Sequence, residues 1–368
     1  MTQSYGERLI VDHLVERVGA YNREVLVNYY VALKAKRFVV LAGSSTLDKM
    51  SLAQGLAEAL VPVPGRQWSL LQAHPWWVSR SGNPGQLALL HARFSSLKLL
   101  EALEEAGVSE DAGLPMPFFV GIDCMSPAEA VCYFDDLPNS RMWLPDGRVV
   151  RVRVPHNLYV TGSLDVEDRE LIVLGPELRG QAITIRLWQD DAAPNARARS
   201  RGEPRLDRQA MFVRAAVRTP DQARARLAQV LTDKSAPLGP LDEVVRRLGV
   251  QGLSPSVYEE ALLYLANAFA EDGHGLFVEA VSENLAIAQD YALAQSVLPH
   301  VVTGRLEPST VRHDELKEYL TPRFPRAHAW IERLPTVRSN VRGARRTRSD
   351  SVSVELGPGL AVARHVAH

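Results

Sequence analysis

The fold is decided by the stretch Phe38-Val39-Val40-Leu41-Ala42-Gly43-Ser44-Ser45-Thr46-Leu47-Asp48-Lys49-Met50-Ser51, which an amphipathic segment extends to Leu60. Five apolar residues lead into a glycine, a short polar loop and a lysine. This order is typical of a phosphate-binding loop, where a buried strand is followed by a loop and a helix N-terminus. We therefore expect a strand, a loop and a helix over 38–60, with a candidate nucleotide site at Gly43, Ser44, Ser45, Thr46, Asp48, Lys49 and Met50.

The loop departs from the pattern G-x-x-x-x-G-K-[ST] at two positions. Asp48 replaces the glycine that lets the backbone curl around a phosphate, and its carboxylate would repel the anion. Met50 replaces the hydroxyl that holds Mg²⁺, and a thioether is a poor ligand for a hard cation. Ser51 lies one residue later, about 100° around the helix, so it is a poor substitute. We expect residual ATP or GTP binding at most, weakened Mg²⁺ ligation, and a fold that requires no cofactor.

The composition indicates a globular intracellular protein. The 368 residues are enough for two or three domains, and the net charge of −1 neither favours nor excludes nucleic acid as a partner. Only two cysteines are present, Cys124 and Cys132, which argues against a disulfide framework. The N-terminus lacks a signal pattern, and no apolar run approaches roughly 18 residues. We expect a cytoplasmic protein without a membrane partner.

A second apolar run, Phe118-Phe119-Val120-Gly121-Ile122-Asp123-Cys124, has the form of a Walker B strand. In such a strand the terminal aspartate holds Mg²⁺ through water, and a following glutamate polarises the attacking water. Here Cys124 takes the glutamate position, and a thiol is a poor general base. We expect Cys124 to be a buried structural residue. A third strand is expected over 157–165 and ends at Asp165, and helices are expected over 7–37 and 86–106. The alternation of strands and helices predicts a doubly wound α/β core.

The chain resembles the McrB-like branch of the AAA+ NTPases over roughly residues 8–335. Ile122-Asp123-Cys124-Met125-Ser126 followed by Tyr133-Phe134-Asp135-Asp136-Leu137 is similar to the family's "LDEMN…YFSDFL" segment. Pro155-His156-Asn157-Leu158-Tyr159-Val160-Thr161-Gly162-Ser163 resembles its "PPNLFVIGTVN" strand. Similarity to the family's helical lid extends from Arg246 to Gly304 and ends with Ile331-Glu332-Arg333-Leu334. The resemblance implies an AAA+-like P-loop NTPase core, a parallel sheet between helices, followed by an all-α lid.

The functional positions are where the sequence leaves the family's pattern. The resemblance matches Cys124 to the Walker B glutamate and Asp165 to the sensor asparagine. The family's arginine falls on Gln181, and Arg179 stands two residues out of register. An arginine that stabilises the transferred phosphate can contribute ~10³–10⁵ in rate, so its displacement is costly. These changes leave no confident catalytic residue and favour a retained scaffold that has lost hydrolysis.

Arginine-rich segments follow the predicted core. We divide the chain into a helical lead-in (1–37), the core (38–188), an Arg-rich insertion or linker (189–240), the lid (241–335) and a basic tail (336–368), which composition predicts to be disordered. Residues 220–231 within the linker have helical spacing. Such runs of arginine form solvated faces or docking sites for acidic partners, and the alternative is binding to a phosphate backbone. The nucleic-acid candidates in the tail are Arg338, Arg342, Arg345, Arg346 and Arg348.

The leading functional hypothesis is a degenerate McrB-like protein that acts as a non-hydrolysing structural or regulatory subunit. The resemblance implies a homo- or hetero-oligomer with an AAA+-type or nuclease partner, in the restriction of foreign DNA. Two alternatives stay open. The chain could be an active ATPase or GTPase that uses Lys49 and Asp123, or a nucleic-acid-binding adaptor that uses its Arg-rich segments.

Overall fold

The computed structural model describes residues 6–61, 64–73, 86–114, 116–126, 130, 133–134, 137–143, 148–166, 182–193, 206–231, 237–249, 253–300 and 313–333. Contacts divide the chain into two units, Met1–Pro335 and Thr336–His368. All described residues belong to the first unit. The five tail arginines therefore lie outside the described residues.

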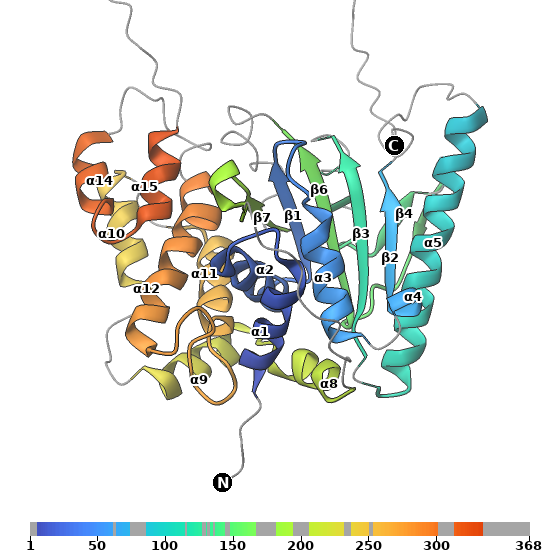
Figure 1. Cartoon of the computed structure of the whole chain (residues 1–368), viewed down its shortest axis with the longest axis horizontal. Helices are drawn as coiled ribbons and strands as arrows, with labels where there is room; N and C mark the ends of the chain where they lie inside the picture. The colour runs from blue at the N-terminus through green and yellow to red at the C-terminus, as the bar shows by residue number, and fades with distance from the viewer. Residues whose placement is uncertain are drawn as a thin grey trace, which may run out of the picture. The chain divides into compact units, whose positions relative to one another are not determined.

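A five-stranded parallel sheet forms the centre of the fold (Figure 1), with strand order β2-β3-β6-β1-β7. Its strands are β1 (Phe38–Gly43), β2 (Trp68–Gln72), β3 (Phe118–Met125), β6 (Leu158–Asp165) and β7 (Ile183–Arg186). The predicted strands over 38–43, 118–124 and 157–165 are confirmed as β1, β3 and β6. The two edge strands, β2 and β7, were not predicted. A separate antiparallel pair joins β4 (Arg141–Trp143) and β5 (Val149–Arg151).

Helices cover both faces of the sheet, as the near-continuous apolar strands require. Along β1, Val39 and Leu41 face a core shared with α1 (Glu7–Val18), α2 (Arg23–Ala35), α3 (Met50–Leu60) and α8 (Leu206–Ala215). Val40 and Ala42 face the opposite core, to which α5 (Gln86–Asp111) contributes Leu99 and Leu103. The prediction of an α/β protein with a parallel sheet between helices is confirmed at this level.

A helical region follows the sheet and lies beyond the β7 edge (Figure 1). Its elements are α9 (Pro220–Val230), α10 (Gly239–Arg247), α11 (Pro255–Asn267), α12 (Val281–Ala292), η3 (Leu293–Val297), α14 (His313–Leu320) and α15 (Pro325–Glu332). Helix α11 packs on α2 and η3 packs on β7, so this region shares its apolar core with one face of the sheet.

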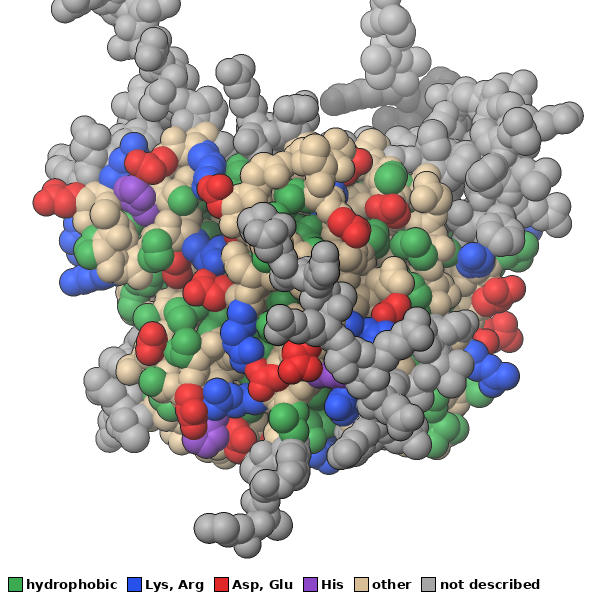
Figure 2. All heavy atoms as spheres, viewed as in Figure 1, with side chains coloured by type: hydrophobic (Ala, Val, Ile, Leu, Met, Phe, Trp, Pro, Cys, Tyr) green, Lys and Arg blue, Asp and Glu red, His purple; other side chains and the backbone are tan. Residues whose placement is uncertain are grey.

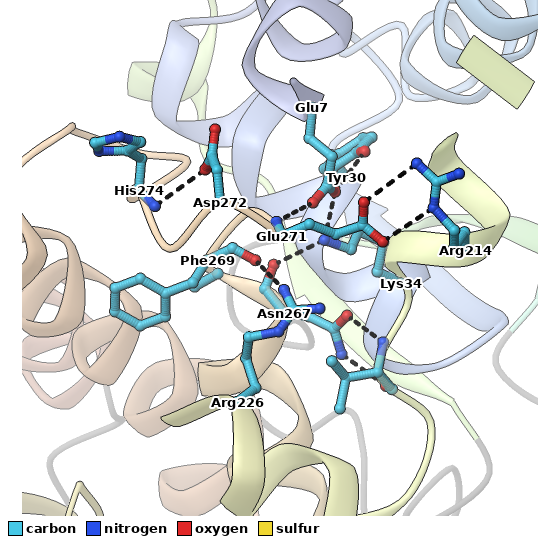
Figure 3. A network of polar contacts seen from close by, with 12 residues as sticks. Glu7, Tyr30, Lys34, Arg214, Arg226, Asn267, Phe269, Glu271, Asp272 and His274 are labelled. Atoms are coloured by element: carbon cyan, nitrogen blue, oxygen red, sulfur yellow. Dashed lines mark hydrogen bonds and ion pairs between the residues drawn. The ribbon is translucent and has the colours of Figure 1, made fainter. Parts of the chain in front are cut away.

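A buried polar cluster joins the helical region to the first two helices (Figure 3). Glu7 Oε1 accepts hydrogen bonds from Lys34 Nζ at 2.5 Å and from Tyr30 Oη at 2.9 Å. Lys34 Nζ also donates to the carbonyl of Asn267 at 3.4 Å, and the Glu271 N–H donates to Glu7 Oε2 at 3.2 Å. The Lys34 and Glu7 side chains are 0% and 1% exposed, so this ion pair lies fully inside the protein. We call this cluster of contacts around the ion pair the Glu7–Lys34 clamp.

Several helix boundaries differ from the sequence prediction, for local reasons. The helix expected over 7–37 is two helices, because Gly19 ends α1 in the left-handed region at φ 42°. The helix expected over 86–106 continues to Asp111. Within 189–240, where the sequence predicted helix only at 220–231, the structure adds η2 (Gln189–Asp191) and α8. Helix α8 is fixed by Phe212, which is fully buried against Tyr30, Phe119 and Tyr159.

The visible surface mixes charges of both signs. Figure 2 shows acidic and basic side chains interspersed over the described part of this face. Several arginines of α8, α9 and the turn between them serve structural contacts: Arg218 donates to the Tyr159 hydroxyl at 2.8 Å, and Arg214 pairs with Glu271 at 3.2 Å. No described helix has the length and apolar character needed to cross a membrane.

Candidate functional site

The candidate site lies at the carboxyl end of β1, where the chain changes direction across the sheet. Strands β6 and β7 flank β1 on opposite sides, so the connection between them crosses it. In open α/β sheets, ligands bind in the crevice at such a switch point. The loop 44–49 follows β1 here, and Gly43 pairs in register with Asp165 at the end of β6. The structure thus brings Lys49, Asp123, Cys124 and Asp165 to the carboxyl edge of the sheet.

Gly43 is required by the close approach of the chain beyond β7. A Cβ atom at this position would lie 2.7 Å from the carbonyl oxygen of Leu187 and 3.2 Å from Leu47 Cδ1. The Leu187 N–H donates to the carbonyl of Ala42 at 2.8 Å, which holds the two segments together. The first glycine of the loop therefore has a packing role that does not involve a ligand.

Lys49 is turned inward beneath the loop and is only 4% exposed. Its ammonium group donates to the carbonyls of Ser44 at 2.8 Å, Gly43 at 3.3 Å and Leu47 at 3.4 Å. It also forms an ion pair with Asp165 Oδ1 at 2.6 Å. Because an ammonium group has three N–H donors, these contacts occupy it fully. Lys49 therefore closes the loop instead of presenting its charge to a ligand.

The loop also uses its own backbone donors. The Thr46 N–H donates to Ser44 Oγ at 3.3 Å, and the Leu47 N–H donates to the Ser44 carbonyl at 3.1 Å. The Lys49 N–H donates to the Leu47 carbonyl at 2.9 Å. A phosphate loop needs such N–H groups to point inward at the anion. In this loop they stabilise the turn itself.

The carboxylate of Asp48 occupies the N-terminus of α3. Asp48 Oδ1 accepts a hydrogen bond from the Ser51 N–H at 3.2 Å, the geometry of a helix cap. Ser51 Oγ donates in turn to the Asp48 carbonyl at 2.7 Å, so its hydroxyl is engaged as well. The position where a helix dipole would attract a phosphate is thus taken by a carboxylate of the chain itself. This contact agrees with the sequence-based argument that the carboxylate of Asp48 would repel an anion at the loop. It also shows that this carboxylate is hydrogen-bonded to the first turn of α3.

Met50 packs inward and is 7% exposed. Its sulfur lies 3.1 Å from where a Cβ at Gly121 of β3 would stand, so Gly121 provides the room for it. Met50 is therefore a core residue of the interface between α3 and β3. A serine or threonine introduced here would have to leave that packing to reach a metal ion.

Asp123 is held by the neighbouring strand. Ser163 of β6, which is 1% exposed, donates through Oγ to Asp123 Oδ1 at 2.5 Å and accepts from the Cys124 N–H at 2.9 Å. Asp123 Oδ1 also accepts from the Cys124 N–H at 3.0 Å. Sequence reasoning missed the role of Ser163, because nothing in the strand pattern indicates which polar side chain will face the aspartate.

Cys124 is exposed, and the prediction that it is a buried structural cysteine is wrong. The register between β3 and β6 shifts between Ile122 and Met125, and Cys124 adopts φ 56° within this irregularity. The bulge turns the side chain out of the core. Burial of part of the group, and then the charges of Asp123 and Asp165, raise the pKa of the Cys124 thiol. The neutral thiol is favoured, so Cys124 also lacks the character of a general base or an activated nucleophile.

Other predicted site residues cannot be placed with these. Arg179 and Gln181 lie outside the described residues. Among the residues that the structure describes, no group of three or more His, Cys, Asp and Glu side chains is arranged to hold a metal ion. One further contact to the loop was not predicted: Gln189 Nε2, beyond β7, donates to Thr46 Oγ1 at 2.5 Å.

The lysine of this loop, several of its N–H groups and an N–H group of the first turn of α3 are thus hydrogen-bonded within the chain. Comparison of the chain with protein-family models and with curated proteins finds no match.

Proposed function

We propose that this protein is a P-loop-like α/β protein that has given up nucleotide hydrolysis and works as a structural or regulatory subunit. The observation that carries the proposal is the ion pair between Lys49 and Asp165 at 2.6 Å. The side chain that would contact a phosphate is bound instead to a carboxylate of the same chain. The capped N-terminus of α3 supports the same conclusion.

The electrostatic cost of placing a phosphate at this loop supports the proposal. At an effective dielectric constant near 20, a carboxylate such as that of Asp48, placed about 4 Å from a phosphate oxygen, adds roughly 4 kcal/mol of electrostatic repulsion. Even if solvent halves this repulsion, about 2 kcal/mol corresponds to roughly 30-fold in affinity. The Lys49–Asp165 pair would have to break as well. We therefore propose that the protein requires no nucleotide and no metal cofactor.

The resemblance to McrB-like AAA+ proteins supports a more specific form of the proposal. In that form the helical region over 241–333 is the lid, and the protein shapes an oligomer with an active AAA+-type motor or a nuclease in a defence assembly. The Glu7–Lys34 clamp is consistent with such a role, because it fastens α11 to α1 and α2. A subunit that serves as a scaffold benefits from being rigid, whereas a motor's lid must move during each cycle.

Nucleotide turnover tests the proposal. Purified protein alone should release phosphate from ATP and GTP only at background rate. Any turnover seen after addition of the proteins encoded beside it should be the same with Lys49→Ala as with the wild type. In the same mixtures, light scattering should detect a complex with an intact AAA+ or nuclease partner. Turnover by the chain alone that is clearly above background and is abolished in Lys49→Ala would overturn the proposal.

A further inference from the structure

A cavity of about 310 Å³ lies between the start of α2, the end of β7, η3 and α15. Its volume is within the range of small-molecule sites, which begins near roughly 300 Å³. None of the described residues of the loop 43–50 lines it. The cavity is therefore separate from the candidate site described above.

Polar groups in the wall of this cavity lack partners in the described protein. Gln295 makes no hydrogen bond through Nε2 or Oε1, and Tyr291 Oη and Trp330 Nε1 make none either. These residues are 8%, 5% and 2% exposed. The nearby hydroxyl of Tyr264 donates to Asn28 at 2.5 Å, and its oxygen still has room to accept from the amide of Gln295. That contact would leave Gln295 Oε1, Tyr291 Oη and Trp330 Nε1 without partners. Buried polar groups without partners are costly and uncommon, so a cluster of them in one cavity points to a ligand.

The backbone that carries Gln295 is itself unusual. Residues Leu293–Val297 form a π-helical turn, η3, directly after α12. Such turns are rare and occur frequently at functional sites, because the extra residue changes where the side chains point. Here Gln295 and its neighbour Ala294 both face the cavity.

The charges around the cavity are balanced. Arg326 pairs with Glu24 at 2.9 Å and with Asp191 at 3.5 Å, and Arg333 pairs with Asp190 at 3.7 Å. Arg186 also lines the cavity, so arginines and carboxylates cancel in formal charge. A neutral ligand fits this environment better than an anion, which would have to compete with the carboxylates.

The walls are aromatic and flat. The Arg326 guanidinium lies 4.2 Å from the centre of the Tyr291 ring, and that of Arg333 lies 4.2 Å from the centre of the Trp188 ring. Trp330 forms a further wall. Side chains of this kind stack on planar heterocycles.

We infer that this cavity binds a neutral planar heterocycle with a hydrogen-bond donor and acceptor side by side, namely a nucleobase or its nucleoside without phosphates. The carboxamide of Gln295 can pair with both atoms of such an edge, as glutamine does with adenine. The Trp330 N–H and the Tyr291 hydroxyl would bind further ring or sugar atoms. This inference goes beyond the proposed function and does not depend on it.

Calorimetry of the full chain with adenosine, guanosine, cytidine and uridine tests the inference. At least one nucleoside should bind with micromolar affinity. If the ligand is adenosine, N6,N6-dimethyladenosine should bind at least about tenfold more weakly, because it lacks the donor. Absence of binding by all four nucleosides and their free bases at millimolar concentration would overturn the inference. Tighter binding of the triphosphates that depends on Lys49 would also overturn it.

Two matched variants separate binding from folding. Gln295→Met removes the carboxamide whose Oε1 has no partner, so it should weaken nucleoside binding at least about tenfold and leave the melting temperature of the free protein unchanged or higher. Gln289→Met, at a buried glutamine of α12 that donates to the Pro237 carbonyl at 2.8 Å, should lower the melting temperature and leave binding unchanged. Trp330→Phe provides a second test of the same site and should also weaken binding. Unchanged affinity in both Gln295→Met and Trp330→Phe would contradict the inference.

Discussion

Among the residues that the structure describes, Lys34 and Lys49 are buried lysines, and their partners differ. Lys34 pairs with Glu7, and both side chains lie fully inside the protein. Lys49 is 3% exposed at its side chain, but its partner Asp165 is 44% exposed. The first pair has no access to water, whereas one half of the second does. A buried ion pair depends on both of its members, while a half-exposed pair can lose one member and let the other be hydrated.

The two lysines also differ in where they lie in the fold. Lys49 stands at the carboxyl edge of the sheet, where a ligand could reach it, yet its ammonium group contacts the loop's own carbonyls. Lys34 lies between helices, where no ligand is expected. Both lysines therefore stabilise the fold through contacts within the chain.

The largest effect is expected at the clamp. Lys34→Met would leave Glu7 buried without its charge partner, so we expect a loss of about 3–5 kcal/mol in the free energy of unfolding. Lys49→Met would lose hydrogen bonds but leave Asp165 hydrated, so we expect a loss of about 1–2 kcal/mol. Urea denaturation of both variants measures the difference. Equal losses, or a greater loss for Lys49→Met, would contradict the contrast between the two pairs.

A pH effect is expected from Asp290, whose carboxylate accepts from the N–H groups of Arg326 and Ala327 at the start of α15. Burial raises the pKa of Asp290 to about 6 from its ordinary value of 3.8. Between these values the folded protein binds more protons than the unfolded chain, so stability from this group is present at low pH and is lost as pH rises through about 6.

The difference in unfolding free energy between wild type and Asp290→Asn should therefore fall by about 2–3 kcal/mol from pH 4 to pH 7. Urea titrations at several pH values give this difference. Asp48, which caps α3 at an exposed position, provides the comparison variant Asp48→Asn. A wild-type advantage over Asp290→Asn that grows with pH would contradict the assignment.

A moderate effect is expected at Gly43. In Gly43→Ala the new methyl group would meet the Leu187 carbonyl, so we expect a loss of about 1–3 kcal/mol. Gly239, the first residue of α10, has no atom within 4 Å of a built Cβ and provides the control, since Gly239→Ala should be neutral or slightly stabilising. Thermal unfolding compares the two. A neutral Gly43→Ala would mean that the loop and β7 are not tightly packed.

The smallest effect is expected at Cys124. Its φ of 56° is unfavourable for a residue with a Cβ and is accessible to glycine. Cys124→Gly should therefore gain about 0.5 kcal/mol or leave stability unchanged, because the relief of strain offsets the greater freedom of the unfolded chain. A loss above about 1 kcal/mol in urea denaturation would instead indicate that the side chain packs.

The centre of the sheet was predictable, and its edges were not. Strands β1, β3 and β6 can be recognised in the sequence as apolar runs, because they are buried on both faces. Strand β7 has four residues, and β2 is only partly buried, so neither gives a distinct pattern. Within the site, the position of Asp48 just before a helix was enough to argue from the sequence that its carboxylate would repel a phosphate. The pairing of Lys49 with Asp165 and of Ser163 with Asp123 could not be predicted, since both depend on the register between strands distant in sequence.

Cys124 shows a different limit of sequence reasoning. Its place at the end of an apolar run led us to expect it in the core, but a β-bulge shifts the register and exposes it. The cavity beside η3 could not be predicted from the sequence either, because residues of α2, β7, η3 and α15 form it together. Features that depend on one segment were predicted, and features that depend on how segments meet were not.

Calorimetric titration of the full chain with MgATP and MgGTP tests the central claim, that the loop is closed to phosphate by its own side chains. We predict no saturable binding at millimolar nucleotide in the wild type. The variant Asp48→Gly with Met50→Thr restores the glycine and the hydroxyl of a phosphate loop, so binding that appears only in this variant would agree with the account. Micromolar, Mg²⁺-dependent binding by the wild type that is lost in Lys49→Ala would contradict it.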